Sequence, residues 1–370
     1  MSRRPSLGVA FIGCGSVMRG AYLPLALDHA RRGDITIIGA ADRTDRHRAV
    51  LQSAGVDRFA VDVDELLGWR DVDLVVVATP VDSHAAIASA ALQAGKHVLL
   101  EKPMAGTVAE ADALVKTAND VSGHLVVAPA VVLSDTYARM SDHIRNGEMG
   151  QISMARALYG WAGPDWSSWF YEPGGGSLRD LGVYNLTTLT GLLGPAVAVV
   201  AMGGITEPQR AVRGELIDVA VEDHVQLLLE FASGAHAVVT SGFTVQQSGV
   251  ASVEIYGTHA TMYLHGHDWS PDGYTLWTNE AASWRRFPER DPHWPWTAGL
   301  SHLIDCVRSG RPPVMTVEHA RHVVEIVAAA HTSLIEGRRQ SVASSFPAPD
   351  VRVEADGGQL HRLHDRGRRH

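Results

Sequence analysis

Cysteine is almost absent from this sequence, which contains two in 370 residues, Cys14 and Cys306. Neither lies in a CxxC pair, so the sequence indicates neither a disulfide framework nor a zinc ribbon. Hydrophobic residues make up 45% of the chain, which is enough to bury a full core without such cross-links. We therefore expect a globular protein of two domains that binds no metal.

An excess of positive charge and long apolar runs are also missing. The net charge of −9 argues against a nucleic-acid partner, because phosphate binding needs a basic face. No apolar run approaches the length of a membrane span, and the run at residues 7–12 is too short for a signal-peptide core. The sequence predicts a cytoplasmic protein that binds no membrane and has a mobile, arginine-rich tail over residues 346–370.

The N-terminal segment has the pattern of a dinucleotide-binding unit. An apolar strand at residues 7–12 leads into a glycine turn, and helical spacing begins at residue 21. The first glycine permits the tight turn, and the second lets the backbone approach a pyrophosphate. The residues expected at the pyrophosphate are Gly13, Gly15, Ser16, Val17 and Met18, the last of which replaces a third glycine.

A second apolar strand, at residues 34–41, ends at Asp42. A carboxylate at this strand end hydrogen-bonds a ribose 2′-hydroxyl and would repel a 2′-phosphate, so Asp42 favours NAD. The adjacent Arg43 leaves NADP open, because a guanidinium can bind a 2′-phosphate. An aspartate that only caps the next helix is the alternative interpretation.

Two further strands lead to the expected site. A buried strand at residues 73–78 is followed by a helix over residues 81–94, and the next strand stops abruptly at residues 101–103. Ligands of open parallel sheets bind at the carboxyl ends of the strands. The residues expected at the coenzyme there are Thr79, Pro80, His84, Glu101 and Lys102. For His84, a role as a cap or packing residue is the simpler alternative.

Strands alternate with helices through residue 128, which predicts an α/β Rossmann domain with a doubly wound parallel sheet over residues 1–128. Residues 129–345 are expected to form an α+β substrate-binding and oligomerisation domain. Its alternating apolar pattern predicts a large, mostly antiparallel, open-faced sheet with one long strand over residues 217–231. Two helices are expected after it, over residues 297–309 and 316–336.

The turn at residues 13–15, Asp42, residues 90–98 and above all Glu101-Lys102-Pro103 resemble the Gfo/Idh/MocA oxidoreductases, over residues 7 to about 340. The resemblance implies NAD or NADP as coenzyme and a small sugar, cyclitol or polyol as substrate. It also implies that the open sheet face is buried in a homodimer or homotetramer. The last two helices would pack near the domain junction, where His302 is a candidate to reach the substrate.

A helix that opens after three glycines carries Asp180 and Tyr184, which lie four residues apart and so on one face. The family has Asp-x-Gly-x-His here, with histidine as the usual acid/base. Tyr184 stands at the histidine position, as in the glucose–fructose oxidoreductase and dihydrodiol dehydrogenase branches. We expect catalysis by Tyr184, with its pKa lowered by the Lys102 ammonium, and an orienting role for Asp180. The alternative is that the pair only packs and caps a helix.

An aromatic loop precedes this helix. Aromatic faces stack on the apolar faces of sugars, so the loop is a candidate substrate wall, unless its rings merely seal the domain junction. The candidate residues are Trp161, Trp166, Trp169 and Tyr171. By contrast, His265 and His267 lack a third ligand at suitable spacing, and we expect them to be solvated rather than bound to a metal.

Together these features predict an NAD(P)-dependent oxidoreductase that transfers a hydride between nicotinamide C4 and a hydroxyl or carbonyl carbon. Two other functions remain open. One is a redox-neutral, NAD-dependent glycosidase, which returns its coenzyme unchanged. The other is a non-catalytic sensor that binds NAD(P) and a partner protein.

Overall fold

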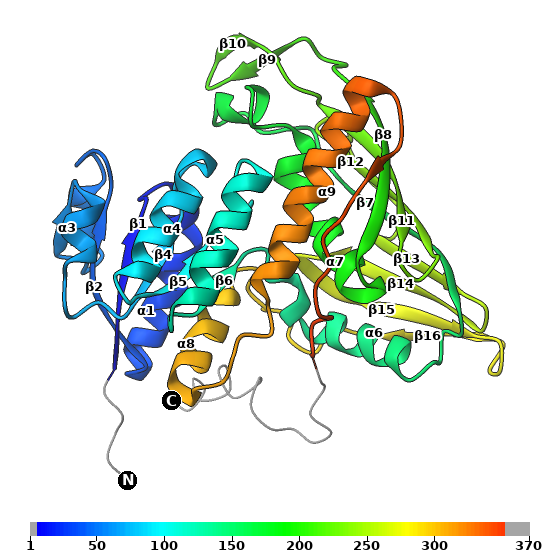
Figure 1. Ribbon diagram of the computed structural model, residues 1–370, viewed down its shortest axis with the longest axis horizontal. Coiled ribbons are helices and arrows are strands. Elements are labelled where there is room, and N and C mark those ends of the chain that lie inside the picture. Colours follow the sequence, from blue (N-terminus) through cyan, green and yellow to red (C-terminus); the bar gives the residue numbers. More distant parts are fainter. Residues whose placement is uncertain (1–5, 352–370) are drawn as a thin grey trace.

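A parallel sheet forms the centre of the first domain in the computed structural model, which describes residues 6–351 (Figure 1). Within that range the sheet has six strands, all of them paired in parallel. In spatial order they are β3 (Arg58–Ala60), β2 (Ile35–Ala41), β1 (Leu7–Ile12), β4 (Leu74–Val77), β5 (His97–Leu100) and β6 (Leu125–Val127).

Both faces of this sheet are buried, as continuous apolar strands require. Val76 and its neighbours on one face pack with residues of α1 and α8, while Val75 and Val77 on the other face pack with α4 and α5. The helices around the sheet are α1 (Leu23–Arg32), α2 (Arg48–Ser53), α3 (Val63–Leu67), α4 (His84–Gln93), α5 (Val108–Asp120) and α8 (Gly299–Ser309).

The second domain is built on a mostly antiparallel sheet, which confirms the predicted fold class. Only the pairing of β7 with β12 is parallel among its described strands. In spatial order these are β16 (Ser283–Phe287), β15 (Ser270–Thr278), β14 (Ala260–His267), β13 (Val253–Gly257), β7 (Ile152–Gly160), β12 (His236–Gly242), β11 (His224–Phe231), β8 (Ala196–Gly204) and β17 (Gln340–Ser341).

Helices cover one face of this second sheet and leave the other open (Figure 1). They are α6 (Asp135–Arg145), α7 (Val183–Leu193) and α9 (Val317–Glu336). Leu227 and Leu229 on β11 point to this covered face and are buried, whereas Leu228 between them is 46% exposed. The alternation therefore follows the two faces, as the pattern in the sequence predicts.

The prediction of one long strand over residues 217–231 is wrong in its first half. The chain instead forms a separate pair of strands, β9 (Gln209–Val212) and β10 (Glu215–Asp218), and β11 begins only at His224. The break lies at Asp223, whose fully buried carboxylate accepts hydrogen bonds from the backbone amides of Thr206 and Glu207. These bonds hold residues 206–207 against the residue that precedes β11.

The C-terminal segment also differs from the expectation. Residues 352–370 lie outside the described part of the chain, but residues 346–351 belong to the tail that the sequence predicted to be mobile. Phe346 and Val351 are buried, and the Phe346 ring stacks on His319 with centroids 4.2 Å apart. Among residues 6–351, no helix is long and apolar enough to cross a membrane.

Two helices begin with a π-turn, in which an amide bonds to the carbonyl five residues earlier. The Leu23 amide bonds to Met18 at the end of η1 (Met18–Tyr22), just before α1, and the Val183 amide bonds to Leu178 at the end of η5 (Leu178–Gly182), just before α7. Short 3₁₀ segments are η2 (Val81–Ser83), η3 (Val131–Leu133) and η4 (Ser168–Tyr171). Both π-turns lie beside the candidate active site.

Candidate active site

The glycine turn after β1 has the geometry that a pyrophosphate needs. Gly13 has φ of 89°, and a Cβ there would lie 2.6 Å from the Ala78 carbonyl oxygen, so only glycine fits. A Cβ on Gly15 would meet no atom within 4 Å, which leaves its backbone open to a ligand. Ser16 is exposed beside it at the start of the helix, and so is Val17. Met18 is fully buried and serves helix packing.

Asp42 lies where the sequence predicts, at the end of β2 and beside the glycine turn. Its Oδ2 atom accepts a hydrogen bond of 2.8 Å from the Cys14 amide, so the carboxylate also holds the turn in shape. Arg43 comes next on the surface and is exposed. Carboxylate and guanidinium therefore lie together at the position that distinguishes the two coenzymes.

The two glycines predict opposite phenotypes. Gly13→Ala is expected to destabilise the fold, because it forces a positive φ and a clash with the Ala78 backbone. Gly15→Ala is expected to leave the melting temperature unchanged and to weaken coenzyme binding about ten-fold or more, because its methyl group occupies the space that a pyrophosphate needs. Thermal denaturation and coenzyme titration of both variants check this. Full coenzyme affinity in Gly15→Ala would contradict the assignment of the turn.

His84 connects the ends of β4 and β5. Its Nδ1 lies 2.8 Å from the Pro103 carbonyl oxygen and its Nε2 lies 2.7 Å from the Thr79 carbonyl oxygen. The ring is buried, with 1% exposed. These contacts fit the packing alternative for His84, which would hold the strand ends that carry Thr79 and Lys102. Pro80 is exposed at the same edge.

Lys102 and Asp180 meet across the two domains. The Lys102 ammonium donates to Asp180 Oδ1 and to the Asp180 carbonyl oxygen, both at 2.7 Å. Both side chains are mostly buried, with 15% and 14% exposed. The ammonium also lies 5.3 Å from the centroid of the Tyr184 ring. The three residues predicted to be catalytic are thus brought together at the end of β5 and the start of α7.

The electrostatics of Tyr184 differ from the expectation. Burial raises its pKa well above the ordinary value, and the carboxylates of Glu101 and Asp180 add to this effect. The Lys102 ammonium, which the sequence analysis expects to lower this pKa, does not outweigh them. Tyr184 is therefore a neutral phenol over the ordinary pH range, which suits a proton donor.

A second tyrosine contacts the segment that carries Lys102. Tyr22, in the first π-turn, donates a hydrogen bond of 2.6 Å to Glu101 Oε1, and Glu101 Oε2 accepts one from the Lys102 amide. Trp296 packs edge-on against the Tyr22 ring, with centroids 5.9 Å apart. The sequence pattern gave no signal for Tyr22, because it lies inside a helix and its partner is remote in the chain.

The aromatic wall beside Tyr184 is formed by residues that the sequence analysis missed. Tyr159, on β7, packs edge-on against Tyr184 with centroids 5.8 Å apart. On its other side lie His267 at 5.2 Å and Trp269 at 6.3 Å, whose rings stack on each other. The sequence predicts only that His267 is solvated and does not indicate this contact. Among residues 6–351, no group of three or more His, Cys, Asp or Glu side chains could hold a metal ion.

The predicted aromatic cluster lies next to this wall and packs largely on itself. Trp161 stacks on Trp166, and Phe170 lies edge-on to both Trp166 and Trp169. Tyr171 is 1% exposed, and its hydroxyl donates to the Pro164 carbonyl, so its ring is part of a core. Tyr159 packs against this cluster and connects it to Tyr184.

His302 lies away from the three central residues. Its Nε2 accepts a hydrogen bond of 3.0 Å from the Val314 amide, and Cys306 Sγ lies 3.5 Å from the same atom. Burial lowers its pKa to about 4, and the nearby His124 contributes. His124 lies just before β6, at the amino ends of the parallel strands, whereas Lys102 follows the carboxyl end of β5. His302 is therefore at the opposite end of the strands from Lys102. We do not include it in the proposed site.

Asp268 is a buried carboxyl group behind the aromatic wall. Its Oδ2 accepts hydrogen bonds from Asn185 and Thr188 of α7, at 2.8 and 3.1 Å. The group is 3% exposed, and its Oδ1 has no hydrogen-bond partner among the described residues. Burial raises its pKa from 3.8 to about 6.

Asp268 should make stability depend on pH. Because its pKa is higher in the folded state, the free energy of unfolding is expected to fall as the pH rises from about 4 to about 6, by up to about 3 kcal/mol. Asp268→Asn cannot ionise and should flatten this slope. Urea unfolding across the pH range measures it, with the exposed Asp120→Asn as control. An unchanged slope in Asp268→Asn would show that Asp268 does not titrate there.

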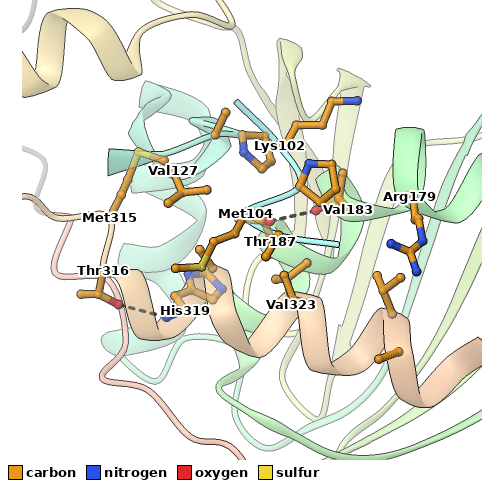
Figure 2. Close-up of a pocket in the computed structure, with 18 of the residues that line it drawn as sticks. Lys102, Met104, Val127, Arg179, Val183, Thr187, Met315, Thr316, His319 and Val323 are labelled. Atoms are coloured by element: carbon orange, nitrogen blue, oxygen red, sulfur yellow. Dashed lines mark hydrogen bonds between the residues drawn. The ribbon is translucent and has the colours of Figure 1, made fainter. Parts of the chain in front are cut away.

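A mostly apolar cavity lies behind the segment after β5 (Figure 2). It is lined by residues of that segment, of β6, of helices α7 and α9 and of the chain just before α9. Among them are Met104, Val127, Val183, Met315 and Val323. The Lys102 ammonium points away from the cavity. The ion pair of Lys102 and Asp180 therefore lies on the other side of this segment, toward Tyr184.

Comparisons with known proteins agree with this architecture. Residues 7–128 match the model described as "Oxidoreductase family, NAD-binding Rossmann fold", and residues 137–263 match the "GFO/IDH/MocA C-terminal domain". A 1,5-anhydro-D-fructose reductase of Ensifer adhaerens is 29% identical, but the match covers 59% of this chain and 64% of that protein, which is under two thirds. A trans-1,2-dihydrobenzene-1,2-diol dehydrogenase of Oryctolagus cuniculus is 24% identical over 85% of this chain and 93% of that protein.

Solved structures show the same fold at low identity. A levoglucosan dehydrogenase in complex with NADH superposes with a TM-score of 0.81 at 22% identity. The superposition covers 92% of this chain and all of that chain. The likeness therefore extends over both domains.

Proposed function

Because the chain belongs to the Gfo/Idh/MocA oxidoreductases, we propose that it is an NAD(P)-dependent dehydrogenase or reductase acting on a hydroxyl or carbonyl group of a sugar, cyclitol or related polyol. One observation carries the proposal. Lys102 of the first domain bonds to Asp180 of the second at 2.7 Å, with the Tyr184 ring 5.3 Å from the same ammonium. This arrangement supports a role for Tyr184 as a proton donor beside the strand ends that would hold a coenzyme.

The residues around the glycine turn fit a dinucleotide. Gly15 and the exposed Ser16 and Val17 would receive the pyrophosphate, and Asp42 would hold the adenosine ribose. Thr79, Pro80, Glu101 and Lys102 would lie at the nicotinamide end. A bound nicotinamide supplies or accepts the hydride. Asp42 favours NAD over NADP, although the exposed Arg43 can also receive a 2′-phosphate.

Tyr184 is the residue that exchanges a proton with the substrate. Its raised pKa keeps the hydroxyl protonated, so in reduction it donates a proton to the oxygen of the substrate carbonyl. In oxidation the Tyr184 hydroxyl must first lose its proton before it can accept one from the substrate, so the rate of oxidation is higher at high pH. Asp180 fixes Lys102 by accepting two hydrogen bonds from the ammonium, and this keeps the ammonium over the Tyr184 ring.

We propose that the substrate is uncharged and cyclic. The side chains of Tyr159, His267 and Trp269 offer stacked faces for a ring next to Tyr184. The nearby cations are engaged: Lys102 binds Asp180, and Arg179 donates to the Gly106 carbonyl at 3.1 Å. A phosphate or carboxylate on the substrate would therefore lack a partner among residues 6–351. Trp161, Trp166 and Trp169 are proposed to contact the outer part of the substrate.

The open face of the second sheet supports self-association. Leu228 pairs with Val238 on one side and with Val200 on the other, so an apolar row crosses three strands on the uncovered face. Met202 is 78% exposed on the edge of the same face. An exposed apolar face of this kind favours a homodimer or homotetramer. Light scattering in solution measures the mass.

The experiment that tests the proposed function is a nicotinamide absorbance screen. The protein is mixed with each of NAD, NADP, NADH and NADPH and with a panel of neutral anhydrosugars, aldoses, inositols and dihydrodiols, together with sugar acids and sugar phosphates. Turnover of a neutral cyclic compound, abolished in Tyr184→Phe, supports the proposal. Tight coenzyme binding without net turnover across the panel contradicts it and favours the redox-neutral glycosidase or the sensor.

A further inference from the structure

We infer that Tyr22 is a positioning residue of the active site: its hydroxyl anchors the Glu101 carboxylate, which in turn fixes the main chain that carries Lys102. The inference rests on the proposed function and adds a residue to it. Tyr22 comes from the helix after the glycine turn, and Glu101 from the end of β5. The contact therefore connects the coenzyme turn with the strand end that carries the ammonium.

The contact is short and closed to solvent. Tyr22 is 1% exposed and Glu101 is 6% exposed, and the distance between Tyr22 Oη and Glu101 Oε1 is 2.6 Å. The other carboxylate oxygen accepts the Lys102 amide at 3.0 Å. Each oxygen of a buried carboxylate thus has one donor, and both donors belong to the site. Burial of an ionised carboxylate requires such partners.

The hydroxyl of Tyr22 can act only as a donor in this contact. Burial raises its pKa well above the ordinary value, and the Glu101 charge raises it further. The ring is held by Trp296, which packs against its edge. Removing the hydroxyl alone therefore keeps the ring in place and leaves Glu101 Oε1 without this donor.

Glu101 also acts on Tyr184 through its charge. After burial, the Glu101 carboxylate is the next cause of the raised pKa of Tyr184. Without the Tyr22 donor, the buried carboxylate is expected to turn away or to take up a proton, and either change lowers the pKa of Tyr184. Asp180 and Asp268 also raise it, and they stay in place when Tyr22 is changed. A change at Tyr22 should thus reach Tyr184 through Glu101, without contact with the substrate.

Tyr22→Phe is the test, and Tyr137→Phe is its matched control. Tyr137 is also a buried phenol, but its hydroxyl has no hydrogen-bond partner among residues 6–351. Tyr22→Phe is expected to lower kcat/KM about ten-fold and to move the alkaline pH profile of oxidation down by about one unit. It should also weaken coenzyme binding. Tyr137→Phe should change none of these.

Glu101→Gln separates position from charge. Its amide can still accept from Lys102 and can donate to the Tyr22 hydroxyl, so the geometry is kept while the charge is lost. We expect its pH profile to shift like that of Tyr22→Phe. Adding Tyr22→Phe to Glu101→Gln should then give no further shift. Additive shifts in the double variant would overturn the inference, because they would mean that Tyr22 acts independently of Glu101.

Coenzyme titration and thermal denaturation test the role of Tyr22 even if no substrate is turned over. If the wild type binds NAD(H) but reduces nothing in the screen, the proposed function fails, while the coenzyme affinity of Tyr22→Phe still decides the inference. Weaker binding in Tyr22→Phe than in Tyr137→Phe supports it. Equal coenzyme affinity and equal melting temperature in the two variants overturn it.

Discussion

Replacing Lys102 by methionine is expected to lower kcat/KM about a thousand-fold and to reduce the free energy of unfolding by about 3 kcal/mol. Methionine keeps most of the side-chain length but cannot donate to Asp180, which is left as a mostly buried carboxylate without its counter-charge. The site then loses the ammonium that lies over the Tyr184 ring. Steady-state kinetics in both directions measure the loss.

Lys116→Met is the matched control for this result. Lys116 is exposed on α5, so the same substitution there should leave the kinetics unchanged. Asp180→Asn should lower kcat/KM in the same direction as Lys102→Met, because it removes the partner of the ammonium. Combining the two substitutions should cost less than the sum of the single effects, since both break one contact. Wild-type rates in Lys102→Met would contradict a catalytic role for this residue.

Tyr184→Phe is expected to reduce kcat by about a thousand-fold in both directions while substrate and coenzyme affinity are kept. Phenylalanine keeps the ring that packs against Tyr159 and Lys102, but it removes the only atom that can exchange a proton. The raised pKa of Tyr184 predicts that wild-type oxidation speeds up as the pH rises through the alkaline range. This dependence should disappear in the variant.

The pH profile distinguishes chemistry from packing. If Tyr184 only packed, Tyr184→Phe would lower kcat by the same factor at every pH, and the shape of the pH profile would not change. Tyr137→Phe again serves as control, because it removes a buried hydroxyl outside the site. A Tyr184→Phe variant with wild-type slope in the alkaline range would assign the proton transfer to another group.

The sequence predicted the first domain closely because its signals are local. The strands have continuous apolar runs, and the expected first strand, residues 7–12, is β1 without change. The turn at Gly13 and the acid at Asp42 also lie where the pattern puts them. Here each prediction depends on residues that neighbour each other in the chain.

The substrate side was predicted less well because it depends on remote contacts. Tyr159, His267 and Trp269 meet only when β7 and the turn between β14 and β15 come together. The aromatic loop was conspicuous in composition, yet Tyr171 is part of a core. The break at Asp223 depends on amides about sixteen residues earlier in the chain. None of these contacts can be predicted from spacing alone.

The pairing of Lys102 with Asp180 shows that residues which the fold brings together can have a different charge balance from the expected one. The sequence predicts that the ammonium lowers the pKa of Tyr184, but the surroundings together have the opposite effect. Burial and the surrounding carboxylates then raise the pKa. The sign depends on distances in three dimensions, and these the sequence does not contain.

The π-turns before α1 and α7 bear on how relatives of this protein are aligned. Each π-turn takes up one residue more than an α-turn, and removing that residue would rotate the chain before the turn by about 100° relative to the helix after it. A one-residue gap in an alignment across residues 178–182 would thus separate Asp180 from Tyr184 while both letters remain matched.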